Sequence, residues 1–332
     1  MSSAQPPGVA SPYVQKEEDL SGNKLTLTTK SYKNMEFLSS FEGRIVRIMC
    51  EFEEPQQRLQ RNFIRSTILF FGSARSMTQA QYNTTVQGLQ SQLAVATEEG
   101  RRASLQSELD RLQKTQWMCK WVDVVENLAR MVTEFARTEQ DIINQSFRYI
   151  PDYFKLVPED RAESLHTLRK RFDDLVVTTG GGPGFMEAAN RGAASVPGAV
   201  TMGMGISLPF EKGLNPYVTD GLAFEFHYFF TRKFWMMYSC RAIVVAPGGF
   251  GTLDEMFELL TLKQTKKIPS LPVVLLGKEF WRTVINWQAL ADYGVISQAE
   301  VDGMLFTDSA EEAMQYIKAF YSRLAEGSAS EV

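Results

Sequence analysis

Two glycine-rich turns constrain the fold of this chain more than any other feature. They are Gly180-Gly181-Gly182-Pro183-Gly184 and Pro247-Gly248-Gly249-Phe250-Gly251. Each follows a short apolar run and precedes a helical pattern, as in a strand that passes through a tight turn into a helix. Repeated strand–helix units pack as a parallel sheet with helices on both faces. We therefore predict an α/β protein with a mostly parallel sheet.

Further apolar runs mark the other strands of this sheet. Residues 66–71 form a β-branched and aromatic run that ends in Gly72-Ser73 and is the first expected strand. The remaining strands are expected at 174–179, 199–206, 242–246 and 272–276. Ser309-Ala310-Glu311-Glu312 has the pattern of a capping box and predicts the start of a closing helix over 309–324.

The chain divides into a main domain and shorter segments around it. We expect disordered tails at 1–31 and 326–332, a helical segment at 32–65 with Pro55 as a breaker, and a catalytic domain at 66–325. Within that domain, the segment at about 78–138 contains no proline. Its apolar pattern predicts an inserted helical hairpin with a break near Glu99-Gly100.

Charge and composition favour a small-molecule ligand. The 332 residues carry a formal net charge of −4, which excludes the broad basic surface of a nucleic-acid-binding protein. Three scattered cysteines favour a reducing compartment, and no apolar stretch suits a membrane span. Neither His166 nor His227 has the spacing of a metal ligand. We expect a cytoplasmic homodimer without nucleic-acid or membrane partners and without a metal or redox cofactor.

The glycine turns also predict a phosphate pocket. Glycine lets backbone N–H groups approach an anion, and the N-terminus of the following helix favours negative charge. The loop at Gly72-Ser73 leaves the first strand in the same way, so three loops are expected to line one crevice. Neither turn contains the dinucleotide motif GxGxxG or the triphosphate ending GK[ST]. Taken alone, Gly180–Gly184 is also compatible with a purely structural turn.

Charged residues accompany this pocket. Asp254 and Glu255 follow the second turn, and we expect both in the first turn of the helix. Arg232 lies between the apolar pairs Phe229-Phe230 and Phe234-Trp235, which favours a buried guanidinium that binds phosphate or orients a carboxylate over a surface charge.

Three segments together resemble the LONELY GUY family of cytokinin riboside 5′-monophosphate phosphoribohydrolases. The segments are GGGPGFMEAANRGA, FFTRKFWMM and PGGFGTLDEMFELLTLKQTKK, and the likeness runs from about Ser66 to Phe320. It is closest to the longer members, which are labelled "possible lysine decarboxylase" and carry an extra N-terminal helix and a helical insert. The resemblance implies a Rossmann-like three-layer α/β fold that binds a nucleoside 5′-monophosphate between the two glycine motifs.

The resemblance also implies roles for individual residues. Arg232 and Glu255 match the catalytic arginine and glutamate of the family, and the second glycine turn would hold the phosphate. Together with the loops above, it gives the residues that we expect to bind the substrate: Gly72, Ser73, Gly180, Gly181, Gly182, Gly184, Met186, Lys233, Pro247, Gly248, Gly249, Gly251, Thr252 and Asp254.

The expected reaction is hydrolysis of the N-glycosidic bond of a purine-type nucleoside 5′-monophosphate, either AMP or an N6-substituted cytokinin nucleotide. A pyridoxal decarboxylase is disfavoured because no lysine follows either histidine. Three alternatives stay open: a broader nucleotide nucleosidase, a non-catalytic carrier of a phosphate-bearing cofactor such as molybdopterin, and a scaffold acting through the helical hairpin.

Overall fold

The computed structural model describes residues 14–18, 21–146, 174–208 and 213–327. It divides the chain into two compact units, one ending at Glu53 and the other beginning at Glu54. His166 and the outer parts of the two expected tails lie outside the described residues. None of the helices in the described ranges combines the length and hydrophobicity that a membrane span requires.

The first unit contains regular structure where we expected a tail. Strands β1 (Val14–Glu18) and β2 (Lys24–Thr28) pair in antiparallel register, and Gly22 between them has a φ of 78° that allows the chain to reverse. Helix α1 (Met35–Ser39) follows and is capped by the side chain of Asn34. The pattern of apolar residues in this part of the sequence did not predict the pairing of β1 with β2.

Helix α2 (Arg44–Arg61) continues through Pro55, where we expected a break. Proline removes one backbone donor and usually kinks or ends a helix. Here Pro55 and Leu59 are the two buried residues of α2, so packing of this face outweighs the lost hydrogen bond.

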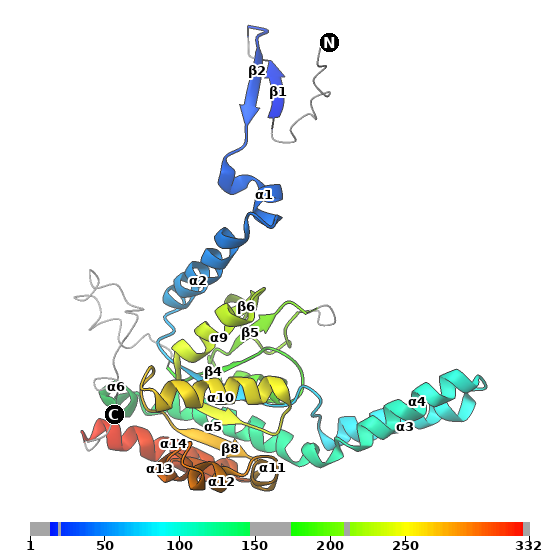
Figure 1. Cartoon of the computed structure of the whole chain (residues 1–332), viewed down its shortest axis with the longest axis vertical. Coiled ribbons are helices and arrows are strands. Elements are labelled where there is room, and N and C mark those ends of the chain that lie inside the picture. Colours follow the sequence, from blue (N-terminus) through cyan, green and yellow to red (C-terminus); the bar gives the residue numbers. More distant parts are fainter. Residues whose placement is uncertain (1–13, 19–20, 147–173, 209–212, 328–332) are drawn as a thin grey trace. The chain divides into compact units, whose positions relative to one another are not determined.

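The second unit is built on a seven-stranded, all-parallel sheet, which confirms the predicted fold class (Figure 1). Its order is β6-β5-β4-β3-β7-β8-β9. The strands are β3 (Thr67–Phe71), β4 (Val176–Thr179), β5 (Met202–Ile206), β6 (Ala223–Phe226), β7 (Cys240–Val245), β8 (Val273–Leu276) and β9 (Met304–Thr307). The two outermost strands, β6 and β9, were not predicted from the sequence.

Helices cover both faces of this sheet. Alternation along β3 shows the two sides: Ile68 and Phe70 belong to one buried cluster, and Leu69 and Phe71 to the other. The first cluster includes residues of α5 (Val122–Thr138), α6 (Gln140–Ser146), α8 (Phe185–Ala194) and α14 (Ala310–Ala325). The second includes residues of α9 (Phe229–Tyr238), α10 (Phe250–Gln264), α11 (Lys278–Val284) and α12 (Trp287–Asp292), with α13 (Gln298–Asp302) at its border. The result is a three-layer α/β structure.

The helical insert is shorter than the expected 78–138. Helices α3 (Gln79–Val95) and α4 (Glu99–Gln113) form the hairpin and share a small core of Leu89, Leu105 and Leu109 (Figure 1). Helix α5 instead packs on α8 within the sheet-covering core, since its buried stripe faces the sheet. The stripe of apolar residues along α5 predicted that this helix packs on another element. The sequence alone did not show that this element is the sheet.

The capping box expected at Ser309 is formed only by half. The Ser309 hydroxyl accepts a hydrogen bond from the backbone N–H of Glu312 at 3.2 Å. The Glu312 carboxylate accepts instead from the hydroxyl of Thr307, at the end of β9. The Glu312 carboxylate therefore bonds to Thr307 and not to the backbone N–H of Ser309, as a full capping box requires. Helix α14 still begins at the predicted place.

Candidate functional site

The order of the strands reverses between β3 and β7. From β3 the chain adds β4, β5 and β6 on one side, and β7, β8 and β9 follow on the other. Ligands of open parallel sheets bind beyond the carboxyl ends of the strands at such a reversal. Phe71 and Val245 are paired at these ends, so the loops that leave them start side by side.

The three glycine loops come together at this edge, as the sequence analysis expected. The N–H of Ser73 donates to the carbonyl of Pro247 at 2.9 Å, which ties the β3 loop to the second glycine turn. The N–H of Phe185 donates to the carbonyl of Ser73 at 3.4 Å, which ties the same loop to the first. The loop after β3 is therefore the common neighbour of both turns.

Some of the glycines are required by this packing. A Cβ at Gly72 would lie 2.7 Å from the ring of Phe185, and one at Gly184, where φ is +72°, would lie 2.5 Å from the carbonyl oxygen of Ser73. A Cβ at Gly248 would lie 2.1 Å from the hydroxyl of Thr252. These three positions exclude any side chain whether or not a ligand binds.

Gly249 and Gly251 have no such reason to be glycine. A Cβ at either position would meet no atom within 4 Å, and neither residue has a positive φ. The structure of the chain alone therefore tolerates a side chain at both positions. Glycine at these positions leaves room for a ligand to approach the backbone closely.

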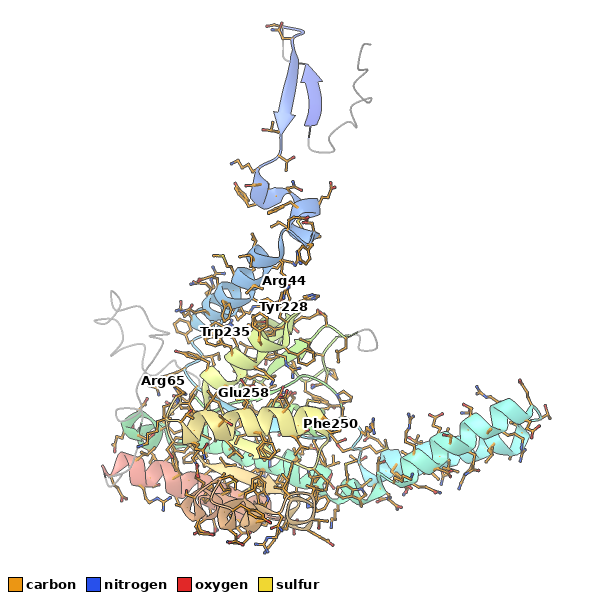
Figure 2. The ribbon with its side chains drawn as sticks, viewed as in Figure 1. Arg44, Arg65, Tyr228, Trp235, Phe250 and Glu258 are labelled. Atoms are coloured by element: carbon orange, nitrogen blue, oxygen red, sulfur yellow. The ribbon has the colours of Figure 1, made fainter. Side chains whose placement is uncertain are left out.

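Helix α10 presents an uncapped N-terminus beside these glycines. Gly249 is the N-cap residue and supplies no side-chain cap, and the first intrahelical bond runs from the N–H of Leu253 to the carbonyl of Gly249. Among the described residues, the N–H groups of Phe250, Gly251 and Thr252 have no acceptor. The Phe250 side chain is 92% exposed at this end of the helix (Figure 2). Such free amides suit an anion.

Arg232 and Glu255 form a buried ion pair between α9 and α10. A terminal nitrogen of Arg232 donates to Oε1 of Glu255, and Glu255 is only 1% exposed. The Nε of Arg232 is also buried and has no hydrogen-bond partner among the described residues. A buried donor without a partner is rare in proteins, and it is explained if a ligand supplies the acceptor.

Burial raises the pKa of Glu255 above its usual value of 4.5. Loss of hydration is the main cause, and the Arg232 guanidinium opposes it by favouring the ionised form. The carboxylate is thus poorly hydrated, which strengthens its interaction with a positive charge that develops near it.

The neighbouring acid points elsewhere. Asp254 is about half exposed and pairs with Lys233 at 2.7 Å, and Lys233 also pairs with Glu258 at 2.9 Å. Figure 2 shows Glu258 farther along the same helix from Phe250. The Lys233 ammonium, which we expected to bind substrate, is therefore held by two carboxylates. This second bridge fixes α9 against α10 next to the Arg232–Glu255 pair.

The expectation that Asp254 and Glu255 lie in the first helical turn is wrong. Helix α10 begins at Phe250, inside the glycine motif, so both acids lie in the second turn. Glu255 follows Thr252 by three residues, so the two side chains share one buried face of the helix. The carboxylate is thus set back from the helix N-terminus by about 7 Å along the axis.

Met186 lies on α8 and covers the first glycine turn. Its sulfur would be 3.0 Å from a Cβ at Gly180, and its terminal methyl 2.8 Å from one at Gly182. Gly181 has a φ of +75° and faces Leu214. The turn therefore has an apolar thioether on one side and a leucine on the other.

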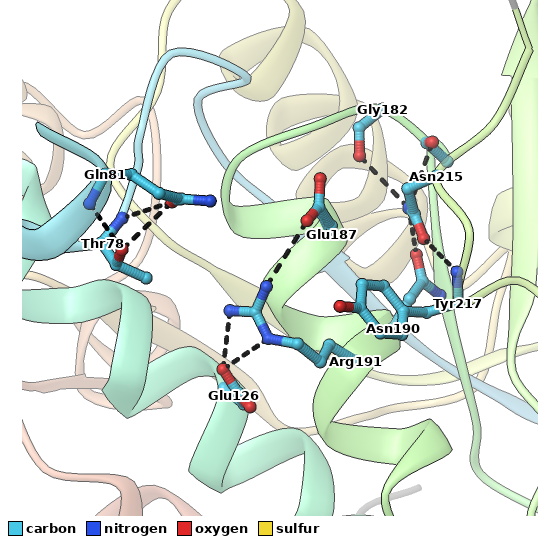
Figure 3. Close-up of polar contacts among 10 residues, drawn as sticks. Thr78, Gln81, Glu126, Gly182, Glu187, Asn190, Arg191, Asn215 and Tyr217 are labelled. Carbon is cyan, nitrogen blue, oxygen red and sulfur yellow. Dashed lines mark hydrogen bonds and ion pairs between the residues drawn. The ribbon is translucent and has the colours of Figure 1, made fainter. Parts of the chain in front are cut away.

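Two asparagines beside this turn were missed by the sequence analysis. Asn190 is fully buried, and the side chain of Asn215 bonds to the carbonyls of Gly181 and Gly182 (Figure 3). A polar residue on the otherwise apolar face of α8 was the signal for Asn190. The Asn-Pro dipeptide at 215–216 indicated only a turn.

Comparison with known proteins supports the family resemblance. A family model described as "Possible lysine decarboxylase" matches residues 186–317, from the start of α8 into α14. No curated protein matches the chain. Among solved structures, the molybdenum cofactor binding protein from the phototrophic bacterium Rippkaea orientalis is similar, with 18% identity and a TM-score of 0.33. That similarity covers 59% of this chain and 86% of the other.

Of the described lysines, Lys233 on α9 and Lys263 on α10 do not suit pyridoxal phosphate, the usual cofactor of amino-acid decarboxylases. A Schiff base requires a neutral amine. The two carboxylates around Lys233 raise its pKa, although burial opposes them, so the amine stays charged. Burial lowers the pKa of Lys263, but this residue lies about 16 Å along α10 from Thr252, away from the helix N-terminus.

Proposed function

We propose that this protein hydrolyses the N-glycosidic bond of a purine-type nucleoside 5′-monophosphate, giving the free base and ribose 5-phosphate. The observation that carries the proposal is the buried ion pair between Arg232 of α9 and Glu255 of α10, because Glu255 lies one turn along the helix whose uncapped N-terminus suits an anion. A phosphate at that N-terminus and an acid farther along the helix suit a substrate with phosphate at one end of a ribose and the bond to be cleaved at the other.

The phosphate is held by the backbone. The free N–H groups of Phe250, Gly251 and Thr252 supply the donors, and Gly249 and Gly251 leave the space for its oxygens. Binding of the phosphate anchors the sugar. The anomeric carbon is thereby positioned by a group that is remote from the bond that breaks.

Glu255 acts on the anomeric carbon. Cleavage of the N-glycosidic bond develops positive charge on the ribose ring, and a buried carboxylate stabilises that charge. The same carboxylate orients a water molecule, whose oxygen forms the new bond to carbon. The electron pair of the broken bond leaves with the base, which takes up a proton, so one water is consumed in each turnover.

Arg232 positions this acid and the sugar. One terminal nitrogen holds Oε1 of Glu255, and the unpartnered Nε is available to a ribose hydroxyl. The Lys233 bridge to Asp254 and Glu258 keeps the two helices in register. Gly72, Ser73 and Met186 border the base, which the family resemblance suggests is adenine or an N6-substituted adenine.

The pKa of Glu255 predicts the pH dependence of this reaction. Glu255 must be ionised to stabilise the cation, and its raised pKa means that it becomes protonated at a higher pH than an ordinary glutamate. We expect kcat/KM to fall on the acidic side with a midpoint above pH 4.5. Initial rates between about pH 4 and pH 9, on enzyme shown to stay folded, measure this. A midpoint at or below 4.5 would contradict the assignment.

A panel of nucleoside 5′-monophosphates tests the reaction itself. The protein is incubated with AMP, an N6-substituted AMP, GMP, CMP and UMP, and the products are separated by chromatography. We expect free base and ribose 5-phosphate from the adenine nucleotides. Release of several bases at similar rates would indicate a broader nucleosidase. Binding without turnover, with a pterin copurifying, would indicate a cofactor carrier.

Two expectations from the sequence stay predictions alongside this function. The protein is expected to be a homodimer, which sedimentation of the purified chain would test, and to be located in the cytoplasm. If deletion of 78–116 removed a binding partner while changes in the glycine turns had no effect, the chain would instead be a scaffold.

A further inference from the structure

A buried polar network lies behind the first glycine turn. Asn190 on α8 accepts hydrogen bonds from the hydroxyl of Thr179 at 2.7 Å and from the amide of Asn215 at 2.9 Å. Its own amide donates to the hydroxyl of Thr201 and to the carbonyl of Met202. The two acceptor and two donor capacities of the Asn190 amide are therefore all used, so its orientation is fixed. Asn190 is thus an anchor between β4, β5 and α8.

Asn215 extends this anchor to the backbone of the turn. Its amide nitrogen donates to the carbonyls of Gly181 and Gly182 at 3.1 and 3.2 Å, and its side-chain oxygen accepts from the N–H of Tyr217 (Figure 3). Its backbone N–H also donates to Gly181 at 2.7 Å. Two consecutive carbonyls of the turn are therefore directed toward one side chain.

This arrangement determines the direction in which the N–H of Gly182 points. The chain contains no cis peptide among the described residues, and in a trans peptide the N–H points opposite to the carbonyl. The N–H of Gly182 therefore points away from Asn215. The N–H of Gly181 is used by Thr179, whereas those of Gly182 and Gly184 have no acceptor among the described residues.

We propose that Asn215, anchored by Asn190, is a positioning residue that holds the turn at Gly180–Gly184 with the Gly182 N–H free for an acceptor oxygen of the substrate. Asn215 comes after β5 in the chain, and β5 is separated from β3 and β7 by β4 in the sheet. The freed N–H of Gly182 consequently points away from the β5 side. This inference rests on the proposed function, because the first glycine turn is one of the loops expected to bind the nucleotide, and Asn215 is the residue that is here assigned to hold it.

Two substitutions separate hydrogen bonding from packing. Asn215→Asp keeps the shape but places a carboxylate oxygen against two carbonyl oxygens, which repels the turn. Asn215→Ala removes the side chain, and water can then bond to the carbonyls. We expect the KM for AMP to rise about tenfold or more in Asn215→Asp and by less in Asn215→Ala, with kcat changed little, since binding is lost equally in ground and transition states.

Asn83→Asp is the matched control. Asn83 is an exposed residue of α3 that bonds to Gln79, so the same change of atoms there is expected to leave KM and kcat unchanged. An equal KM for AMP in Asn215→Asp and the unchanged protein would overturn the proposal. So would a larger effect of Asn215→Ala than of Asn215→Asp, because that order indicates packing.

Hydrogen exchange of the turn gives a second readout that needs no turnover. We expect the backbone amides of a peptide covering 177–188 to exchange faster in Asn215→Asp than in Asn83→Asp. If the unchanged protein neither binds nor cleaves AMP, the proposed function fails, and exchange alone then decides whether Asn215 holds the turn. Unchanged exchange in Asn215→Asp would refute that role.

Discussion

Replacing Glu255 by glutamine is expected to lower kcat for an adenine nucleotide by about 10³-fold or more. Glutamine has nearly the same shape but cannot carry the negative charge that faces the ribosyl cation. Its amide also orients water poorly, since one of its two terminal atoms is a donor. We expect KM to change much less than kcat, because the phosphate contacts at Phe250, Gly251 and Thr252 lie roughly 4.5–7.5 Å from Glu255 along the helix.

Glu258→Gln is the matched control for this change. Glu258 lies on the same helix, three residues after Glu255, and pairs with Lys233 on the same neighbouring helix. It loses the same charge, so a general electrostatic effect would slow both variants equally. We expect turnover by Glu258→Gln to stay within about threefold of the unchanged protein, because partly exposed ion pairs contribute little.

Stability must be measured alongside the rates. Glu255→Gln leaves the Arg232 guanidinium without its anionic partner in a buried place, which costs about 1–3 kcal/mol. Thermal unfolding of both variants shows whether the protein is folded at the assay temperature. Near-normal turnover by a folded Glu255→Gln protein would remove Glu255 from the mechanism.

Most of the sheet could be predicted because its inner strands carry a strong local signal. Strands β3, β4 and β7 are fully buried and rich in β-branched and apolar residues, and a glycine follows each of them within three residues. Parallel strands covered on both faces favour such a composition. Strands β6 and β9 have four residues each and no glycine turn at their ends. As edge strands they are only partly buried, so their sequences lack the same signal.

The pairing of Arg232 with Glu255 could be predicted, but the contacts around the pair could not. Arg232 stood out as a charge among aromatic residues, and Glu255 by its place after the glycine motif. The start of α10 was placed one turn too late, since glycine has a poor helix propensity and hid the first turn. The partners of Lys233 depend on how α9 packs against α10, which no local pattern encodes.

Tertiary contacts also explain why the asparagine network was missed. Asn190 and Asn215 are 25 residues apart and meet only because β4, β5 and α8 are brought together. Each residue separately matches an ordinary turn or helix position. The same holds for Gly249 and Gly251: the sequence shows glycine, and only the structure shows that the surrounding space is empty.

That empty space gives the second large prediction. Gly251→Ala is expected to weaken binding of AMP about 100-fold while leaving the fold intact or slightly more stable. The new methyl group meets no atom of the chain within 4 Å, and alanine favours the helix by up to about 1 kcal/mol over glycine. The loss of binding arises because the methyl group occupies the space where a phosphate oxygen meets the free N–H groups of α10.

Two further glycines provide the comparison. Gly88→Ala on α3 also adds a methyl group in open space within a helix, so it should match Gly251→Ala in thermal stability but not affect binding. Gly248→Ala should lower stability as well as binding, because its methyl group would lie 2.1 Å from the Thr252 hydroxyl. Calorimetric titration with AMP and thermal unfolding measure the two effects separately. If Gly251→Ala bound AMP as tightly as Gly88→Ala, the phosphate would not lie at the start of α10, and the acid at Glu255 would face a different part of the ligand.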